Sequence, residues 1–212
     1  MEKKNIIITV IVVALVIVGF VFAYKASNKP SQYQPFAQGM KDAGLKFYGA
    51  FWCPHCQAQE KALGMSRQSL ERMGLYLECS QPSGQGQLQL CVDQKIESYP
   101  TWEYPKEFSY TTEATPTVCE VQPGPAGQSP LCEVGTGYGS NFLKSWIFPG
   151  KEVIALHSAT DPKHEGNTWT FAAGTRSTGE MPLELLSEFS GVPLPQDHST
   201  ETTALEPENN EN

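Results

Sequence analysis

The longest hydrophobic run of the chain lies near its N-terminus. From Ile6 to Ala23 the residues are uncharged and apolar, with only Thr9 and Gly19 interrupting the run. A helix of this length, at about 1.5 Å per residue, crosses a bilayer core of about 30 Å, whereas the hydrophobic part of a signal peptide spans about 7–15 residues. The pattern therefore predicts a single membrane anchor over residues 1–24.

The charges beside this run predict its orientation. Lys3 and Lys4 precede it with only Glu2 opposing them, so the positive-inside bias keeps the N-terminus cytoplasmic, although Lys25 and Lys29 weaken the asymmetry. A cleaved signal peptide, which would leave the rest secreted or periplasmic, stays an alternative, but no Ala-x-Ala site follows the run. A buried helix of a soluble core fits less well because such a helix normally carries a polar stripe.

After a linker over residues 25–35, the hydrophobic pattern of residues 36–192 alternates between helical and strand periods. This alternation predicts one domain, a mixed α/β sandwich. The expected elements are a helix over Phe36–Ala43, a strand over Leu45–Trp52, a helix from Cys53 to about Leu63 continuing as helical pattern to Gly74, a strand over Leu75–Cys79, a helix over Leu88–Ile96, an extended run over Glu97–Glu103, a strand over Thr168–Ala173 and a helix over Pro182–Ser190.

Residues 105–167 interrupt this pattern with a segment rich in Pro and Gly. A structureless loop of that length is unusual in a compact domain, so we predict an inserted lobe with strands of its own. The expected strands, Phe142–Ile147 and Glu152–Leu156, flank a turn at Pro149-Gly150. The C-terminal segment, residues 193–212, holds five acids and no Lys or Arg, and is predicted to be disordered.

Charge and cysteine content narrow the function. A net charge of −8 without a basic cluster argues against a nucleic-acid partner. The six cysteines all follow the apolar run, an even number in a compartment that permits disulfides. They fall into neighbouring pairs, although sequence alone leaves other connectivities open: Cys53 with Cys56, Cys79 with Cys91, and Cys119 with Cys132.

The first pair stands in the motif Cys53-Pro54-His55-Cys56, directly after an apolar strand and at the start of a helix. Unpaired backbone N–H groups and the helix dipole favour a thiolate at Cys53, and His55 can add an N–H or a positive charge. Pro54 suits the first turn of a helix. We expect Cys53 to be the exposed attacking thiol and Cys56 the buried resolving thiol of thiol–disulfide exchange.

Two other interpretations of the motif remain open. Cys79 and Cys91 could join it in a zinc site, although zinc ribbons usually repeat the close pair, and the motif could be an inert bridge. Haem attachment is excluded because Gln57, not His, follows the second cysteine. If the motif is redox-active, the cysteine pair is itself the redox group, and no metal or other cofactor is expected.

Three segments resemble a known family in combination: YGAFWCPHCQAQ at Tyr48–Gln59, YLECS at Tyr76–Ser80 and YPTW at Tyr99–Trp102. They are similar to the thioredoxin-like domain fused to, or partnered with, bacterial vitamin K epoxide reductase homologues, and Pro54-His55 is the inner dipeptide of DsbA-type oxidases. The resemblance covers roughly Phe36–Glu103 plus the last strand and helix. It implies a thioredoxin-like mixed sheet flanked by helices, with a long insertion before the last strand.

The resemblance also implies roles for single residues. Cys53 becomes the nucleophile, Cys56 the resolving thiol, and Cys79 and Cys91 a second, structural disulfide. Pro100 becomes a cis-proline beside the active site, which an X–Pro bond permits, although a trans proline at a strand edge is the default from sequence alone. The surface that meets an extended substrate would include Trp52, Tyr99, Pro100 and Thr101.

Two departures from the family change the expected chemistry. Many thioredoxins carry a buried acid six residues before the first active-site cysteine, and Phe47 stands there in this chain. The membrane bundle of the vitamin K epoxide reductase homologues does not occur in this sequence, so the resemblance implies a separate quinone-linked partner of that type or of DsbB type. Remaining histidines, His157, His164 and His198, lack metal spacing and are expected at the surface.

The sequence therefore predicts a membrane-anchored extracytoplasmic thiol-disulfide oxidoreductase, mainly a dithiol oxidase for reduced exported proteins. A reductase or isomerase, for example in cytochrome c maturation, is the alternative within the same class. A non-catalytic binding module, with all three cysteine pairs as permanent staples, is the alternative from another class.

Overall fold

The computed structural model describes residues 11–20, 31–119, 144–150 and 153–195. The chain divides into two compact units, residues 1–31 and residues 32–212. In the first unit, residues 11–20 are helical. No helix within the described ranges is both long and apolar enough to cross a membrane. Most of the predicted anchor, half of the linker and most of the acidic tail lie outside the described residues.

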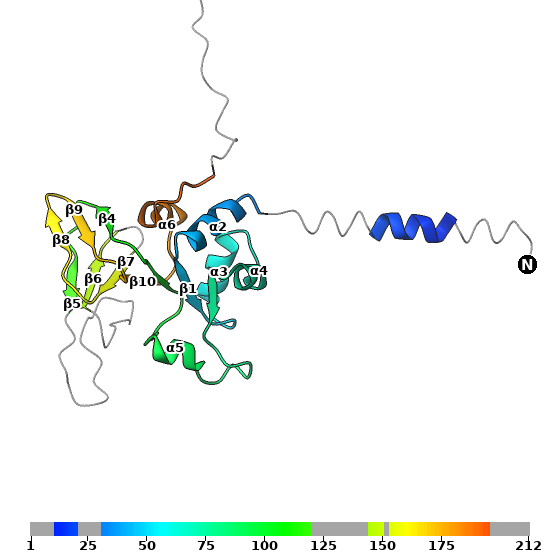
Figure 1. Ribbon diagram of the computed structural model, residues 1–212, viewed down its shortest axis with the longest axis horizontal. Coiled ribbons are helices and arrows are strands. Elements are labelled where there is room, and N and C mark those ends of the chain that lie inside the picture. The colour runs from blue at the N-terminus through cyan, green and yellow to red at the C-terminus, as the bar shows by residue number, and fades with distance from the viewer. Residues whose placement is uncertain (1–10, 21–30, 120–143, 151–152, 196–212) are drawn as a thin grey trace, which may run out of the picture. The chain divides into compact units, whose positions relative to one another are not determined.

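The second unit alternates helices and short strands along its first half, as the hydrophobic pattern predicts (Figure 1). Its helices are α2 (Gln34–Asp42), α3 (Pro54–Ala62), α4 (Arg67–Met73), α5 (Gln89–Asp93) and α6 (Leu183–Ser190). Its strands are β1 (Lys46–Gly49), β2 (Tyr76–Glu78), β3 (Thr101–Glu103), β4 (Phe108–Thr111), β5 (Thr117–Cys119), β6 (Lys144–Phe148), β7 (Ile154–Ser158), β8 (Lys163–Glu165), β9 (Thr168–Phe171) and β10 (Arg176–Thr178).

A seven-stranded mixed sheet forms the centre of this unit, in the order β2-β1-β3-β10-β7-β6-β5. Among the described strands of this sheet, only the β1–β2 pair is parallel, and the other neighbouring pairs are antiparallel. A second sheet has the order β4-β9-β8. The mixed α/β class predicted from the sequence is therefore confirmed at this level: a large mixed sheet flanked by helices.

The strand next to β3 in the main sheet is not the one that the sequence pattern indicated. Thr168–Ala173 was expected as the last strand of the mixed sheet. The segment does form a strand, β9, but β9 pairs with β4 in the second sheet, and β10 pairs with β3. The aromatic side chains of β9, Trp169 and Phe171, both pack against Phe148 of β6. Arg-Ser-Thr of β10 is short and polar, so its sequence carries no apolar strand pattern.

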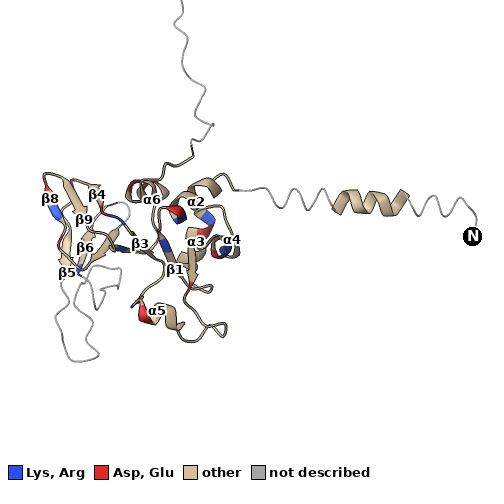
Figure 2. Ribbon diagram, viewed as in Figure 1, with Lys and Arg blue, Asp and Glu red and all other residues tan. Residues whose placement is uncertain are grey.

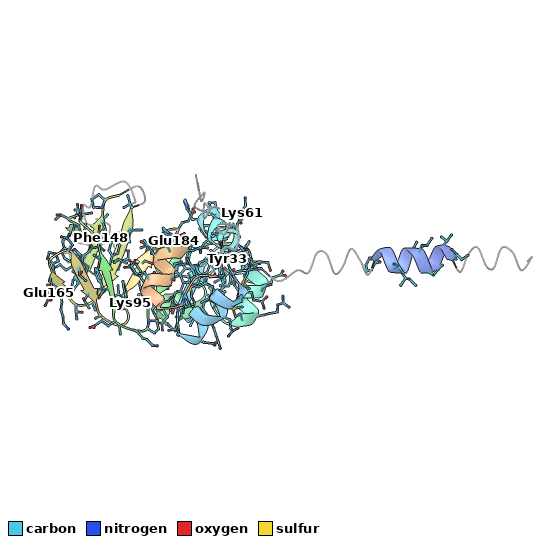
Figure 3. All side chains as sticks on the ribbon, turned by 90° about the horizontal axis from the view of Figure 1, so that it is seen from above. Tyr33, Lys61, Lys95, Phe148, Glu165 and Glu184 are labelled. Carbon is cyan, nitrogen blue, oxygen red and sulfur yellow. A yellow bond between two sulfur atoms is a disulfide. The ribbon has the colours of Figure 1, made fainter. Side chains whose placement is uncertain are left out.

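The insertion forms strands on both sides of the predicted turn at Pro149-Gly150, namely β6 and β7. They extend the main sheet, because β7 pairs with the free edge of β10. Strand β5 pairs with β6 at the edge of the main sheet, whereas β4 and β8 of the insertion pair with β9 in the second sheet. In both views, β4, β8 and β9 lie at the opposite end of this unit from α3 and α4 (Figures 1 and 3).

Stacked aromatic side chains fill the core beneath the motif. Phe47 of β1 is fully buried, stacks on Trp102 of β3 with ring centroids 4.6 Å apart, and meets the edge of Tyr76 of β2 at 4.8 Å. Such rings bury a large apolar area in a fixed geometry. The position where an acid was expected from the family is thus part of the apolar core.

A charged cluster ties three strands of the main sheet together. Glu103 of β3 accepts hydrogen bonds from Lys46 of β1 at 2.8 Å and from Arg176 of β10 at 2.7 Å. Burial alone would raise the pKa of Glu103, but these two cations outweigh it and lower the pKa. Elsewhere in this unit, acidic and basic residues are scattered over helices and strands (Figure 2).

The expectation that His157 lies at the surface is wrong. His157 of β7 is 2% exposed; its Nδ1 lies 2.7 Å from Ser145 Oγ and its Nε2 2.9 Å from Thr178 Oγ1. Two hydroxyl partners satisfy both ring nitrogens, which makes burial of the imidazole possible. His164 is exposed and stacks on Trp169, while His198 lies outside the described residues.

Candidate active site

The motif lies where β1 turns into α3. Cys53 is the N-cap residue of α3, in an extended conformation, and its N–H donates to the Ala50 carbonyl at 2.9 Å. Pro54 is the first residue of the helix, where its missing N–H costs nothing. The strand and the helix thus hold Cys53 over the N-terminus of α3, and Cys56 follows one turn further along.

Cys53 and Cys56 are both free thiols, and both are buried. The expectation that Cys53 is exposed is wrong: its exposed fraction is 5%, against 0% for Cys56. The neighbouring loop covers Cys53, because the Cys53 thiol donates to the Tyr99 carbonyl over 3.6 Å. The expected order of the two thiols is retained, since Cys53 is the outer one and Cys56 the inner one.

The environment of Cys56 favours its protonated form. Burial is the main cause that raises the pKa of this thiol, and the neighbouring Cys53 and the Glu60 carboxylate raise it further. A hydrogen bond from the backbone of Ala50 acts in the opposite direction and is too weak to reverse the shift. Cys56 is therefore a thiol at neutral pH.

The loop that covers Cys53 contains a cis peptide bond between Tyr99 and Pro100. The ring of Tyr99 meets Trp52 edge-on at 6.1 Å, and its hydroxyl accepts a hydrogen bond from Gln87 at 2.7 Å. Trp52 is 50% exposed and forms an apolar surface beside Cys53. Thr101, expected at the substrate surface, is instead buried in β3, with its hydroxyl donating to the Ser98 carbonyl.

His55 points away from the core and pairs with an acid from a distant part of the chain. Its Nδ1 lies 2.7 Å from Oε1 of Glu180, and both side chains are largely exposed. Sequence reasoning missed Glu180 because 125 positions separate the two residues and no local pattern marks it. An exposed pair of this kind orients the imidazole and contributes little to stability.

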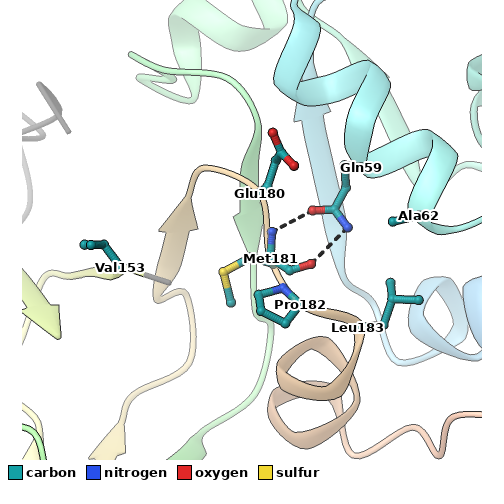
Figure 4. Close-up of a pocket in the computed structure, with 7 residues that line it drawn as sticks. All are labelled: Gln59, Ala62, Val153, Glu180, Met181, Pro182 and Leu183. Carbon is teal, nitrogen blue, oxygen red and sulfur yellow. Dashed lines mark hydrogen bonds between the residues drawn. The ribbon is translucent and has the colours of Figure 1, made fainter. Parts of the chain in front are cut away.

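A buried amide holds the segment that carries Glu180. Gln59 of α3 is 1% exposed; its side chain donates to the Met181 carbonyl at 3.1 Å and accepts from the Met181 N–H at 2.7 Å (Figure 4). The Gly179 N–H also donates to the Pro100 carbonyl. These contacts tie the 179–182 segment to the helix of the motif and to the cis-proline loop. A pocket of about 450 Å³ lies here, lined by Gln59, Ala62, Val153, Glu180, Met181, Pro182 and Leu183.

On the other flank of the motif, Glu78 at the end of β2 organises the turn before Cys53. Its Oε1 accepts from the backbone N–H groups of Phe51 and Ser80, and its Oε2 pairs with Arg67. The indole N–H of Trp52 donates to the Ser80 hydroxyl at 2.8 Å. The half-exposed indole is therefore held in one orientation beside the thiols.

The remaining cysteines are bonded where the structure describes them. Cys79 and Cys91 form a disulfide with Cα atoms 5.5 Å apart, which joins β2 to α5. A zinc site that recruits these two thiols is therefore wrong, because the disulfide consumes them. Cys119 is also disulfide-bonded, and its expected partner, Cys132, lies outside the described residues.

Comparison with known proteins relates part of this chain to a thiol-disulfide oxidoreductase. No family model matches the chain. The chain is 35% identical over 85 residues to the thiol-disulfide oxidoreductase LTO1 of Arabidopsis thaliana. The aligned part covers 38% of this chain and 22% of the relative, so the chain matches about a fifth of that protein's length.

Proposed function

We propose that this chain is a thiol-disulfide oxidoreductase in which Cys53 and Cys56 alternate between the dithiol and the disulfide. The similarity to a curated thiol-disulfide oxidoreductase supports this class. The observation that carries the proposal is the pair of free thiols at the start of α3, one beside the Tyr99 carbonyl and the other sealed in the core. The fold that we propose for this site is thioredoxin-like.

Oxidation of a client proceeds in two balanced steps. A client thiolate attacks Cys53 Sγ of the disulfide form, the Cys53–Cys56 bond breaks, and a mixed disulfide with Cys53 forms. A second client thiolate then attacks the client sulfur of that bond, which releases the oxidised client and leaves Cys53 reduced. The client loses two electrons and the cysteine pair gains them. Cys56, which its surroundings keep protonated, acts as the leaving and resolving group.

Within this class we propose the direction of a dithiol oxidase acting on reduced exported proteins. Support comes from the Pro54-His55 dipeptide, and from Phe47, which replaces an acid that would favour reductase chemistry. We further propose that residues 1–24 anchor the chain in the membrane with its catalytic part outside. A quinone-linked membrane protein, similar to vitamin K epoxide reductase or DsbB, would reoxidise the pair.

The binding-module alternative treats all three cysteine pairs as permanent staples. Two of these pairs differ in the structure: Cys79 and Cys91 form a disulfide, whereas Cys53 and Cys56 are free thiols. A free pair beside a half-exposed Trp52 suits exchange better than a staple does.

Trapping of clients tests the proposal. In the variant Cys56→Ala, Cys53 can still reach the mixed disulfide by attacking a disulfide of a client. No second thiol of this chain then displaces the client, so we expect Cys53 adducts with several proteins on non-reducing gels of the expressing cells. The double variant Cys53→Ala with Cys56→Ala is the control and should show none. If Cys56→Ala forms no reducible adducts, the assignment of protein clients is wrong.

A further inference from the structure

Helix α3 carries a partly buried acid one turn beyond the inner thiol. Glu60 follows Cys56 by four residues, so the two side chains share one face of the helix, with Cβ atoms about 5–6 Å apart. The carboxylate oxygen Oε1 of Glu60 is buried and has no hydrogen-bond partner among the described residues. A buried carboxylate oxygen without a partner is costly and calls for a functional explanation.

Glu60 belongs to a cluster of titratable side chains that includes the Cys56 thiol. The hydroxyl of Tyr76 is also buried without a partner in the described part of the chain, and it interacts electrostatically with both Cys56 and Glu60. Tyr76 packs so closely against Gly49 that a Cβ there would lie 2.6 Å from the hydroxyl. The Cys56 thiol, the Glu60 carboxylate and the Tyr76 phenol therefore interact electrostatically with one another.

Glu60 is suited to holding and releasing a proton. Burial raises its pKa, while Arg67, through its charge and its backbone N–H, lowers it, and burial prevails. A carboxyl with a raised pKa is a stronger base than an exposed one and is closer to neutrality. The titratable and charged groups that act on Glu60 or share its cluster are Cys56 on α3, Arg67 and Glu71 on α4, and Tyr76 and Glu78 on β2.

Thiol–disulfide exchange at Cys56 needs a neighbouring group that can accept a proton and return it. When Cys56 resolves a mixed disulfide it must lose its proton, and when it leaves from the disulfide it departs as a thiolate in a site that disfavours charge. The strand β1 supplies no acid, since Phe47 stacks on Trp102 in the core. His55 is directed to the surface and paired with Glu180.

We propose that Glu60 is the proton acceptor and donor of Cys56, an inference that rests on the proposed exchange activity. In resolution, the Glu60 carboxylate takes the proton of the Cys56 thiol. The Cys56 sulfur then bonds to Cys53 Sγ, and the bond from Cys53 to the client breaks, releasing the client as a thiolate. In the oxidase direction the Glu60 carboxyl returns the proton to the departing Cys56 thiolate.

A two-phase reaction of the reduced protein with Ellman's reagent tests this role. Cys53 attacks the reagent and releases one thionitrobenzoate, in a phase whose rate rises with reagent concentration. Cys56 then attacks the mixed disulfide and releases a second one, in a phase independent of reagent concentration. The first phase reports the proposed activity, and the second reports the proposed proton transfer.

We expect Glu60→Gln to slow the second phase by about 100-fold near neutral pH, the effect typical of a lost general base. In this variant the rate of the second phase should rise about tenfold per pH unit, because hydroxide must remove the proton of the Cys56 thiol. The first phase should stay within about twofold of the wild type. Glu60→Asp, which keeps a carboxylate, should recover part of the rate and the wild-type pH profile.

Glu188→Gln is the matched control. Glu188 on α6 is also a partly buried acid. Burial raises its pKa, and a hydrogen bond from the backbone of Thr111 lowers it. No sulfur atom of the described residues contributes to the pKa shift of Glu188. Both phases should be unchanged in this variant. A wild-type second phase with an unaltered pH profile in Glu60→Gln would overturn the role of Glu60 and leave the proposed activity standing. A wild-type protein without a first phase would overturn the proposed activity itself.

Discussion

At the scale of single residues, the two thiols of the motif differ in access. Cys53 retains a small exposed area next to Trp52, whereas Cys56 has none and its burial raises its pKa. Thiolate character and access together decide which cysteine reacts. The motif alone indicated this order of the two thiols but not the cover over Cys53, which comes from a loop 46 residues away.

Alkylation tests this difference. We expect iodoacetamide to modify the folded, reduced protein once, at Cys53, and to leave Cys56 unmodified, as read by mass spectrometry of peptides. Unfolding in guanidinium should make both cysteines react, which controls for the chemistry of the label. Modification of Cys56 in the folded protein at the rate of Cys53 would contradict the burial described here.

The buried His157 predicts a pH dependence of stability. Burial, with a smaller effect of the Arg176 charge, lowers the pKa of His157 from 6.5 to about 4. The unfolded chain therefore binds a proton at a higher pH than the folded chain does. The stabilisation is complete above about pH 6.5 and is lost as the pH falls towards 4, by roughly 3 kcal/mol in total.

Urea unfolding at several pH values measures this effect. The variant His157→Gln should lose less stability than the wild type between pH 6.5 and 4.5, since it lacks the titrating group. His164→Gln, which changes an exposed histidine, should keep the wild-type dependence. If the free energy of unfolding changes equally with pH in the wild type and in His157→Gln, His157 does not cause the pH dependence.

At the scale of elements, the buried side-chain amide of Gln59 joins α3 to the 179–182 segment. Gln59→Ala removes two hydrogen bonds and leaves the Met181 N–H and C=O without them. We expect a loss of about 2–4 kcal/mol in the free energy of unfolding. Gln57→Ala on the same helix removes one exposed bond to the Phe51 carbonyl and should cost less than about 1 kcal/mol. Similar losses in both variants would contradict the special role of Gln59.

Sequence periodicity predicted the elements that carry their own apolar pattern. The first helices and strands, the motif at the start of α3 and the hairpin of β6 and β7 all have such a pattern. The pattern failed where pairing depends on distant partners: β10 is polar and short, and β9 belongs to another sheet. For the same reason Gln59, Glu60 and Glu180 could not be assigned to the site, because their roles depend on contacts that only the folded chain creates.

At the scale of the whole molecule, the cysteines that the structure describes are of two kinds, disulfide-bonded and free. The Cys79–Cys91 disulfide joins β2 to α5 and suits an oxidising compartment, whereas Cys53 and Cys56 are free thiols, which we propose to cycle. The apolar N-terminal sequence is the basis for proposing that the chain works at the outer side of a membrane. The similarity to a curated thiol-disulfide oxidoreductase extends over about a fifth of that protein's length.

The equilibrium of the full chain with glutathione tests the central proposal most directly. Alkylation and mass spectrometry at a series of glutathione ratios would show which cysteines change state and at what potential. We predict one reversible two-electron transition confined to Cys53 and Cys56, with a potential above about −200 mV, as an oxidase requires. A potential near the value of about −270 mV typical of thioredoxin would contradict the oxidase direction. Absence of a reversible Cys53–Cys56 disulfide would contradict the proposed activity as a whole.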